Sequence, residues 1–290
     1  MSSIHFTKGK TMKSRFKIEV FRHLGQMVPI EIIPKFIDFS DGTVQVQLED
    51  NSDVIKNLPT TVVVTATLLD SIGIMALYQL TDLINHYFGN STSKNLVLSY
   101  LPYARYDRRM GKYDSHSLKV FGTMINSLNY DEVAVDDLHS HVPSGLINNL
   151  VERYQQVDTF GKSAVNHRKY DYYISPDLGA IKKSQAASQR FGVPLLVATK
   201  KRDEKTGYTV FDSLMTFGQE TKDKTCIILD DICDGGMTFI NLAENLKKTY
   251  GFKQVDLFVS HGLFSRGRKL DHVDDVYCFN DFENAIKSEN

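Results

Sequence analysis

Short apolar runs and helix-like segments alternate along most of the chain. Runs that suit buried strands recur at 61–67, 95–100, 131–135, 171–175, 195–198, 226–229 and 255–259. Helix-like segments lie between several of them, and the predicted helices cover 71–87, 117–128, 179–190 and 238–250. A strand, a helix and a further strand in succession predict a parallel sheet. We therefore expect an α/β fold with mainly parallel sheets flanked by helices.

Other segments show different patterns. Phe16, Ile18 and Val20 alternate with charged residues, which suggests an edge strand. Residues 36–48 predict a hairpin that turns at 40–43, and this pattern alone indicates an ordinary surface hairpin. A last strand is expected within 271–282, and 143–158 is expected to cross between two halves of the chain.

The stretch from Thr225 to Thr238 carries the most specific chemical signal. Asp230 and Asp231 follow the apolar run, where that strand is expected to end, and Asp234, Gly235 and Gly236 precede a helix that opens at Thr238. Glycines let backbone N–H groups converge on an anion, and a helix N-terminus favours negative charge. The carboxylates would repel a bare phosphate, so we expect them to face ribose hydroxyls or a Mg²⁺ ion. A ribose 5-phosphate group fits this arrangement, and a tight turn with solvated aspartates is the alternative.

A basic segment follows the predicted strand at 95–100. It contains Arg105, Arg108 and Arg109, with Tyr103, Tyr106 and Asp107 among them. Arginines past a strand end can bind a polyphosphate through paired hydrogen bonds, and the tyrosines could flank a base. A solvated basic loop is the alternative.

Further charged groups follow other predicted strands. Asp137 and His139 suit a divalent metal or a phosphate, although a structural histidine is an equal alternative. Asp177 follows the strand at 171–175, at the edge where open α/β sheets place ligands. The run at 199–207 is either a cationic flap that closes on phosphates or a solvated hairpin tip.

Composition narrows the class of protein. The chain has 290 residues, 42% of them hydrophobic, and a formal net charge of −1, so no partnership with nucleic acid is expected. The three cysteines, in no CxxC pair, suggest free thiols in a reducing compartment. The N-terminus lacks the apolar core of a signal peptide, and no apolar run reaches membrane-spanning length. We therefore expect a cytoplasmic protein with no membrane partner.

Several motifs together resemble the ribose-phosphate pyrophosphokinase family, also called phosphoribosyl pyrophosphate (PRPP) synthetases, over about residues 16–280. The most specific is Pro-Tyr-Ala-Arg-x-Asp-Arg-Arg at 102–109. The motifs at 137–139, 175–177 and 200–202 follow in the family's order, whereas the loop at 230–238 alone would also fit phosphoribosyltransferases.

The resemblance implies two tandem type I phosphoribosyltransferase-like domains, at 1–148 (the ATP side) and 149–290 (the ribose-phosphate loop and flap). It leaves open whether the last segment packs back on the N-terminal domain. The implied reaction transfers the β,γ-diphosphoryl group of MgATP to the C1 hydroxyl of ribose 5-phosphate, giving PRPP and AMP. The implied cofactor is Mg²⁺, with ATP as substrate, and the implied assembly is a homo-oligomer, a dimer or a hexamer.

The resemblance also implies roles for single residues. The catalytic group would comprise Lys200, Arg202 and His139, and the metal would be held by His139 and Asp177. The ribose hydroxyls would contact Asp230 and Asp231, and the 5-phosphate would contact Asp234, Gly235, Gly236, Met237 and Thr238. The ATP site would comprise Arg105, Tyr106, Asp107 and Arg108, with Phe39 and Asp41 of a hairpin that reaches a neighbouring subunit.

Two positions depart from the family's pattern. Met237 lies in a loop that usually reads Asp-Thr-Gly-Gly-Thr, and Thr43 stands where the family usually has Glu. The first departure leaves room for an acceptor whose 5-phosphate is esterified, such as ADP-ribose, which would give ADP-ribose 1-pyrophosphate. A non-catalytic regulator associated with PRPP synthetase is a further alternative, and a phosphoribosyltransferase is a third, although it gives the 102–109 motif no evident role.

Overall fold

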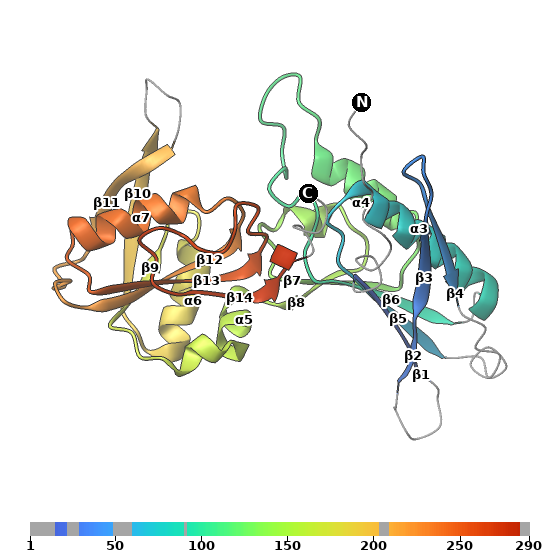
Figure 1. Cartoon of the computed structure of the whole chain (residues 1–290), viewed down its shortest axis with the longest axis horizontal. Helices are drawn as coiled ribbons and strands as arrows, with labels where there is room; N and C mark the ends of the chain where they lie inside the picture. The colour runs from blue at the N-terminus through green and yellow to red at the C-terminus, as the bar shows by residue number, and fades with distance from the viewer. Residues whose placement is uncertain (1–14, 22–28, 49–59, 90–91, 203–208, 285–290) are drawn as a thin grey trace. The chain divides into compact units, whose positions relative to one another are not determined.

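The computed structural model describes residues 15–21, 29–48, 60–89, 92–202 and 209–284. The chain forms two compact units, one from Met1 to Arg153 and one from Tyr154 to Ser288 (Figure 1). The predicted boundary follows residue 148, a few residues earlier. Each unit has its own hydrophobic core and its own sheet of six strands.

The sheet of unit 1 has the strand order β2-β1-β5-β6-β7-β8. These strands are β1 (Phe16–Phe21), β2 (Ile30–Ile32), β5 (Thr61–Ala66), β6 (Ser93–Leu98), β7 (Glu132–Asp136) and β8 (Leu150–Tyr154). Strands β5, β6 and β7 are parallel, and β1 runs antiparallel to both of its neighbours. The expectation that β1 is an edge strand is therefore wrong, because the three-residue strand β2 covers its outer side.

The helices of unit 1 follow the predicted pattern closely. They are α3 (Ser71–Phe88) and α4 (Ser117–Asn126), with a 3-10 turn η1 (Val142–Gly145). Asp70 caps α3 by accepting a hydrogen bond from the Gly73 N–H at 2.6 Å. The same carboxylate pairs with the buried Arg15 guanidinium at 2.7 Å, which ties the start of α3 to β1.

The predicted hairpin is confirmed as the antiparallel pair β3 (Pro34–Asp38) and β4 (Val44–Leu48). It packs on α3 through Gln79, whose side chain donates to the Val44 carbonyl at 2.7 Å and accepts from the Val46 N–H at 2.9 Å. This amide replaces a neighbouring strand as the partner of β4 at these two backbone groups.

The sheet of unit 2 has the order β11-β10-β9-β12-β13-β14, and only β11 runs antiparallel. Its strands are β9 (Tyr172–Ser175), β10 (Leu195–Arg202), β11 (Thr209–Met215), β12 (Thr225–Cys233), β13 (Gln254–Gly262) and β14 (Val276–Asp281). The helices are α5 (Gln156–Lys162), α6 (Ile181–Phe191) and α7 (Met237–Lys248), with a 3-10 turn η2 (Ala164–His167).

Helix α7 covers one face of this sheet, and α5 and α6 cover the other (Figure 1). Alternation along β12 explains the division, because Ile228 packs in the cluster with α7 whereas Ile227 and Leu229 pack with α5 and α6. The apolar run of β12 is thus buried on both sides, as its composition predicts.

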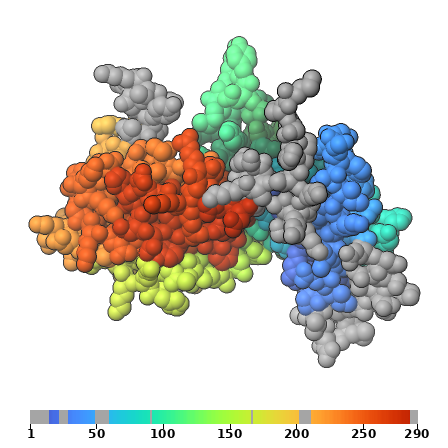
Figure 2. All heavy atoms as spheres, in the orientation of Figure 1, coloured from blue at the N-terminus to red at the C-terminus, as the bar shows by residue number. Residues whose placement is uncertain are grey.

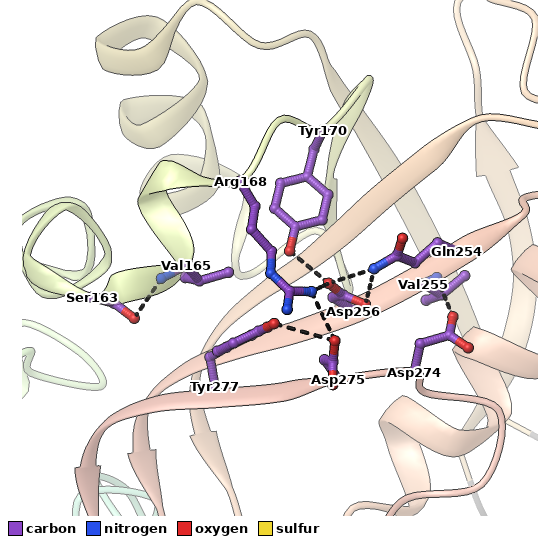
Figure 3. Close-up of polar contacts among 10 residues, drawn as sticks. All are labelled: Ser163, Val165, Arg168, Tyr170, Gln254, Val255, Asp256, Asp274, Asp275 and Tyr277. Carbon is purple, nitrogen blue, oxygen red and sulfur yellow. Dashed lines mark hydrogen bonds and ion pairs between the residues drawn. The ribbon is translucent and has the colours of Figure 1, made fainter.

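A polar cluster stabilises the amino end of β13 (Figure 3). The fully buried Asp256 accepts a hydrogen bond from the Tyr170 hydroxyl at 2.6 Å and from the Gln254 amide at 3.0 Å. Arg168 pairs with Asp275 at 2.7 Å and reaches Asp256 at 3.5 Å. Burial and then the bond to Asp256 raise the pKa of Tyr170, so its hydroxyl stays a donor at neutral pH.

Three elements differ from the sequence expectations. Strand β8 lies within the segment expected to cross between halves, and helix α5 begins in it. The predicted strand at 226–229 extends to Cys233, since β13 pairs with it as far as Gly262. Within the described residues, no helix has the length and apolar character needed to cross a bilayer.

Candidate functional site

The carboxyl edge of the unit 2 sheet gathers most of the predicted groups of that unit. Parallel strands end at the same edge, so the residues at the ends of β9, β10 and β12 lie near one another. Asp177 follows β9, Lys200 lies late in β10, and the acidic-glycine segment lies at the end of β12. The parallel sheet, rather than proximity in sequence, therefore assembles this edge.

Asp177 and Lys200 form a close ion pair at this edge. The Lys200 ammonium lies 2.7 Å from Oδ2 of Asp177, whose Oδ1 accepts the Ala180 N–H at 3.0 Å. Burial alone would raise the pKa of Asp177, but Lys200 and the backbone N–H groups of Ala180 and Gly179 outweigh burial and leave that pKa below its ordinary value. Asp177 is thus an anion held against a cation from the neighbouring strand.

Asp230 and Asp231 lie inside β12 and not after it, which corrects the expected strand end. The strand continues because its pairing with β13 outweighs the poor strand propensity of aspartate. Asp231 is buried and lies 3.4 Å from the Lys183 ammonium, and Oδ1 of Asp230 accepts the Asp231 N–H at 2.9 Å. Burial and then the negative charge of Asp231 raise the pKa of Asp230 well above its ordinary value.

The glycine segment forms a tight entry into α7. Gly236 is the residue before the helix and has a φ of +76°, a region that favours glycine. A Cβ atom on Gly236 would lie 2.4 Å from Cδ2 of Leu270, so a side chain has no room there. The helix begins at Met237, one residue earlier than predicted, and both Met237 and Thr238 are exposed at its N-terminus.

The segment after β13 lies along this glycine loop, which the sequence did not indicate. The Ser265 hydroxyl hydrogen bonds Oδ1 of Asp234 at 2.5 Å, the Arg266 side chain lies against Gly235, and Leu270 packs under Gly236. The signal available was a basic run directly after a parallel strand, in Ser-Arg-Gly-Arg-Lys. Lys183 was missed as well, because its partner Asp231 is distant in sequence.

The predicted flap begins on an antiparallel hairpin. Strands β10 and β11 pair from Val197 with Met215 to Arg202 with Thr209, and Lys201 forms an ion pair with Asp212 at 3.0 Å. Residues 203–208 and the Arg202 side chain lie outside the described part of the structure. Strand β10 (Leu195–Arg202) is longer than the strand predicted at 195–198.

The predicted ATP-site segment of unit 1 follows β6. Residues 101–116 protrude from the surface as the green segment of Figure 2. Arg105, Tyr106 and Arg108 are exposed, whereas Asp107 is half-buried. Arg109 donates to the Asp114 carbonyl, which braces this segment. The segment thus presents cationic and aromatic groups to solvent.

The second predicted cluster of unit 1 lies after β7. Asp137 is buried and has a φ of +39°, and His139 is exposed two residues later. The preceding residue, Asp136, is fully buried and accepts two hydrogen bonds of 2.7 Å from Arg153 of β8. This ion pair holds the end of β7 to β8 and so fixes the backbone from which Asp137 and His139 extend.

The turn of the β3–β4 hairpin carries Phe39 and Asp41. Phe39 is exposed, and Oδ1 of Asp41 accepts the Thr43 N–H at 2.9 Å and the Thr43 hydroxyl at 2.7 Å. The backbone and then the side-chain bond from Thr43 lower the pKa of Asp41. Thr43 therefore orders this turn locally.

Across the described residues, no group of three or more His, Cys, Asp or Glu side chains converges as a metal cage. Mg²⁺ is usually held by one or two carboxylates together with substrate phosphates. Asp177 is one ionised carboxylate at the ligand edge of unit 2, and this donor set fits an ion that arrives with a nucleotide.

The chain is similar to proteins that act on phosphoribosyl compounds. The phosphoribosyl transferase domain model matches residues 147–289. A ribose-phosphate pyrophosphokinase of Mycoplasma pneumoniae is 28% identical over 79% of this chain and 67% of its own length. One of Campylobacter jejuni is 25% identical over 81% of this chain and 73% of its own. One of Agrobacterium fabrum is 30% identical over 59% of this chain, and the match spans only 54% of that relative.

A solved structure extends the comparison over both units. The crystal structure of phosphoribosylpyrophosphate synthetase from Mycobacterium smegmatis is similar with a TM-score of 0.63 at 20% identity, covering 82% of this chain and 79% of that one. At this identity the likeness concerns the fold. Together with the matched domain, it confirms the predicted α/β class with two phosphoribosyltransferase-like domains.

Proposed function

Because the chain belongs to the ribose-phosphate pyrophosphokinase family, we propose that it transfers the β,γ-diphosphoryl group of MgATP to the C1 hydroxyl of ribose 5-phosphate. The observation that carries the proposal is the carboxyl edge of unit 2. A cation and an anion in contact, two adjacent acids and a glycine-lined helix N-terminus lie there together. Together these groups suit a site that binds both a phosphorylated sugar and a polyphosphate better than a site for only one of them.

The acceptor would lie along the end of β12. The carboxylates of Asp230 and Asp231 accept hydrogen bonds from the ribose hydroxyls, and the backbone N–H groups from Asp234 to Thr238 hold the 5-phosphate. Gly236 supports this role, because the left-handed backbone and the contact with Leu270 leave room only for hydrogen at that Cα. Different parts of one short segment would thus bind the 5-phosphate and the ribose hydroxyls.

In the reaction, the C1 oxygen forms a bond to the β-phosphorus of ATP. The bond from that phosphorus to the oxygen bridging to the α-phosphorus breaks, the hydroxyl proton leaves, and AMP departs with the electron pair. Negative charge spreads over the equatorial oxygens, so positioning and cationic stabilisation supply most of the catalysis. Lys200 and Arg202 of β10 and His139 of unit 1 would supply cationic or hydrogen-bonding groups.

The nucleotide would be bound by Arg105, Tyr106, Asp107 and Arg108 of unit 1. Both arginines are exposed, and a guanidinium can pair with two phosphate oxygens, which supports this role. When bound, Mg²⁺ would neutralise phosphate charge. Asp177 is the side chain of unit 2 proposed as its ligand, and His139 is the candidate ligand that unit 1 carries. In a homo-oligomer, a dimer or hexamer, Phe39 and Asp41 of the hairpin would complete the adenine pocket of a neighbour.

A second acceptor remains a candidate because of one residue. Met237 opens α7 with its side chain 51% exposed, at a place where a small or hydroxyl-bearing residue would bind a phosphate monoester closely. An esterified 5-phosphate, as in ADP-ribose, has one oxygen fewer to satisfy and tolerates an apolar neighbour. The same bonds would form and break, and the product would be ADP-ribose 1-pyrophosphate.

The test measures AMP released from ATP with ribose 5-phosphate, ADP-ribose or no acceptor. We expect AMP in equal amount to a new C1 diphosphate with ribose 5-phosphate. AMP formation only with ADP-ribose would instead favour the second acceptor. No acceptor-dependent AMP with either, from folded protein, would favour a non-catalytic regulator.

A further inference from the structure

Arg266 lies against the glycine loop of unit 2. A Cβ atom placed on Gly235 would be 3.4 Å from both Cδ and Nε of Arg266, so the side chain runs across the backbone of the loop. Gly235 belongs to the segment proposed to hold the 5-phosphate of the acceptor. The guanidinium is exposed and therefore accessible to a ligand at this loop.

The charge of Arg266 is available, unlike that of two lysines at the same edge. At the same edge, Lys200 is paired with Asp177 at 2.7 Å and Lys183 with Asp231 at 3.4 Å. Over the described ranges of the chain, the guanidinium of Arg266 makes no hydrogen bond or ion pair. Asp234, which precedes Gly235 in the loop, instead accepts a hydrogen bond from the Ser265 hydroxyl.

The chain around Arg266 is held on both sides. Ser265 hydrogen bonds Asp234 at 2.5 Å, and Leu270 is buried against Gly236. These contacts fix the backbone on either side of Arg266 relative to the loop. Only the side chain then has to be ordered when a ligand binds, which reduces the entropic loss.

The loop itself has few side-chain donors for a phosphate. Its donors are backbone N–H groups and the hydroxyl of Thr238, and the first side chain of α7 is the apolar Met237. A guanidinium presents paired N–H donors that match two phosphate oxygens. We propose that Arg266 determines specificity for the acceptor by pairing with its 5-phosphate, and so supplies the charge and donors that Met237 does not.

This inference rests on the proposed function, and its test separates the two. Steady-state kinetics would compare the wild type with Arg266→Ala, Arg266→Lys and the control Lys269→Ala. Lys269 is an exposed cation of the same segment, so its loss changes the net charge equally. Binding of ribose 5-phosphate would also be measured by calorimetry without ATP, and thermal unfolding would verify the fold of each variant.

Losing a hydrogen-bonded charge at a bound phosphate weakens binding by roughly ten- to a hundredfold. We expect Arg266→Ala to raise the KM and Kd for ribose 5-phosphate by about that factor, with the KM for ATP unchanged. Arg266→Lys should recover part of the loss, because charge remains without the planar fork. Lys269→Ala should match the wild type.

Equal behaviour of Arg266→Ala and Lys269→Ala would overturn the inference while the wild-type enzyme still makes PRPP. A parallel rise in the KM for ATP would overturn it too, since the effect would then not be specific to the acceptor. A wild type that neither binds ribose 5-phosphate nor releases AMP with it would instead refute the proposed function.

Discussion

Replacing Gly236 with alanine tests the geometry of the phosphate loop by two separable effects. An L-residue at a φ of +76° carries about 1–2 kcal/mol of backbone strain. The new methyl group would also lie 2.4 Å from Cδ2 of Leu270, a side chain that is only 5% exposed. Forcing a buried side chain aside typically costs about 1–3 kcal/mol. We therefore expect Gly236→Ala to lower the free energy of unfolding by about 2–5 kcal/mol.

Gly218 provides a matched control for the backbone effect. It has a φ of +81° in an exposed turn, and a Cβ atom there would meet nothing within 4 Å. Gly218→Ala should therefore lose only the strain of about 1–2 kcal/mol. The difference between the two variants, measured by urea denaturation, isolates the contact with Leu270.

A double-mutant cycle tests the contact directly. Leu270→Ala alone should lose about 2–5 kcal/mol by leaving a cavity, but it should lose less in the Gly236→Ala background, where it relieves the overlap. The KM for ribose 5-phosphate should rise in Gly236→Ala and not in Gly218→Ala. Equal destabilisation by both glycine variants, together with additivity of Gly236→Ala and Leu270→Ala, would refute this reasoning.

Other expected outcomes follow from single contacts. Lys200→Ala should keep the fold and reduce kcat by on the order of a hundredfold. The control Lys201→Ala breaks only a surface pair with Asp212 and should keep near-normal turnover. Unchanged kcat in Lys200→Ala would remove this lysine from the catalytic group. Tyr170→Phe should lower the free energy of unfolding by about 1–3 kcal/mol, because the buried Asp256 loses a donor, and the fully exposed Tyr113→Phe should be neutral in the same denaturation experiment. Burial raises the pKa of Cys226 well above its ordinary value, that of Cys233 to about 12 and that of Cys278 to about 11. Thiol reagents at neutral pH should therefore label the folded protein slowly, and rapid labelling would contradict this.

The regular elements were predictable where one pattern ran long enough. Helix α3 spans more than four turns between Asp70 and Gly89, so both its periodicity and its caps were visible. The β3–β4 hairpin was predictable from alternation around a glycine turn. The central parallel strands of each sheet were evident as apolar runs, although several of their ends were not.

Short or non-local features explain the misses. Strand β2 has three residues and helix α5 has seven, which is too few for periodicity to distinguish them from loops. The position of β1 was misjudged because its neighbour β2 was not recognised. Strand β12 runs through two aspartates because β13 pairs with it further along, and a single sequence does not reveal that register.

Some residues of the candidate site were likewise predictable from the sequence, and others were not. Asp177, Lys200 and Asp230 were predictable, because charged residues near the carboxyl ends of parallel strands converge at one edge. The contacts of Lys183 with Asp231 and of Arg266 with Gly235 join residues far apart in sequence. Only the packing of α6 and of the segment after β13 brings them to the site.

In the proposed reaction, a diphosphoryl group passes from ATP to the C1 oxygen of ribose 5-phosphate. The most direct measurement uses ribose 5-phosphate that carries a heavy oxygen isotope at C1, with products analysed by mass spectrometry and phosphorus NMR. We expect PRPP with the heavy oxygen retained between C1 and phosphorus, and AMP in equal amount. Release of ADP, or a C1 product without the label, would contradict it.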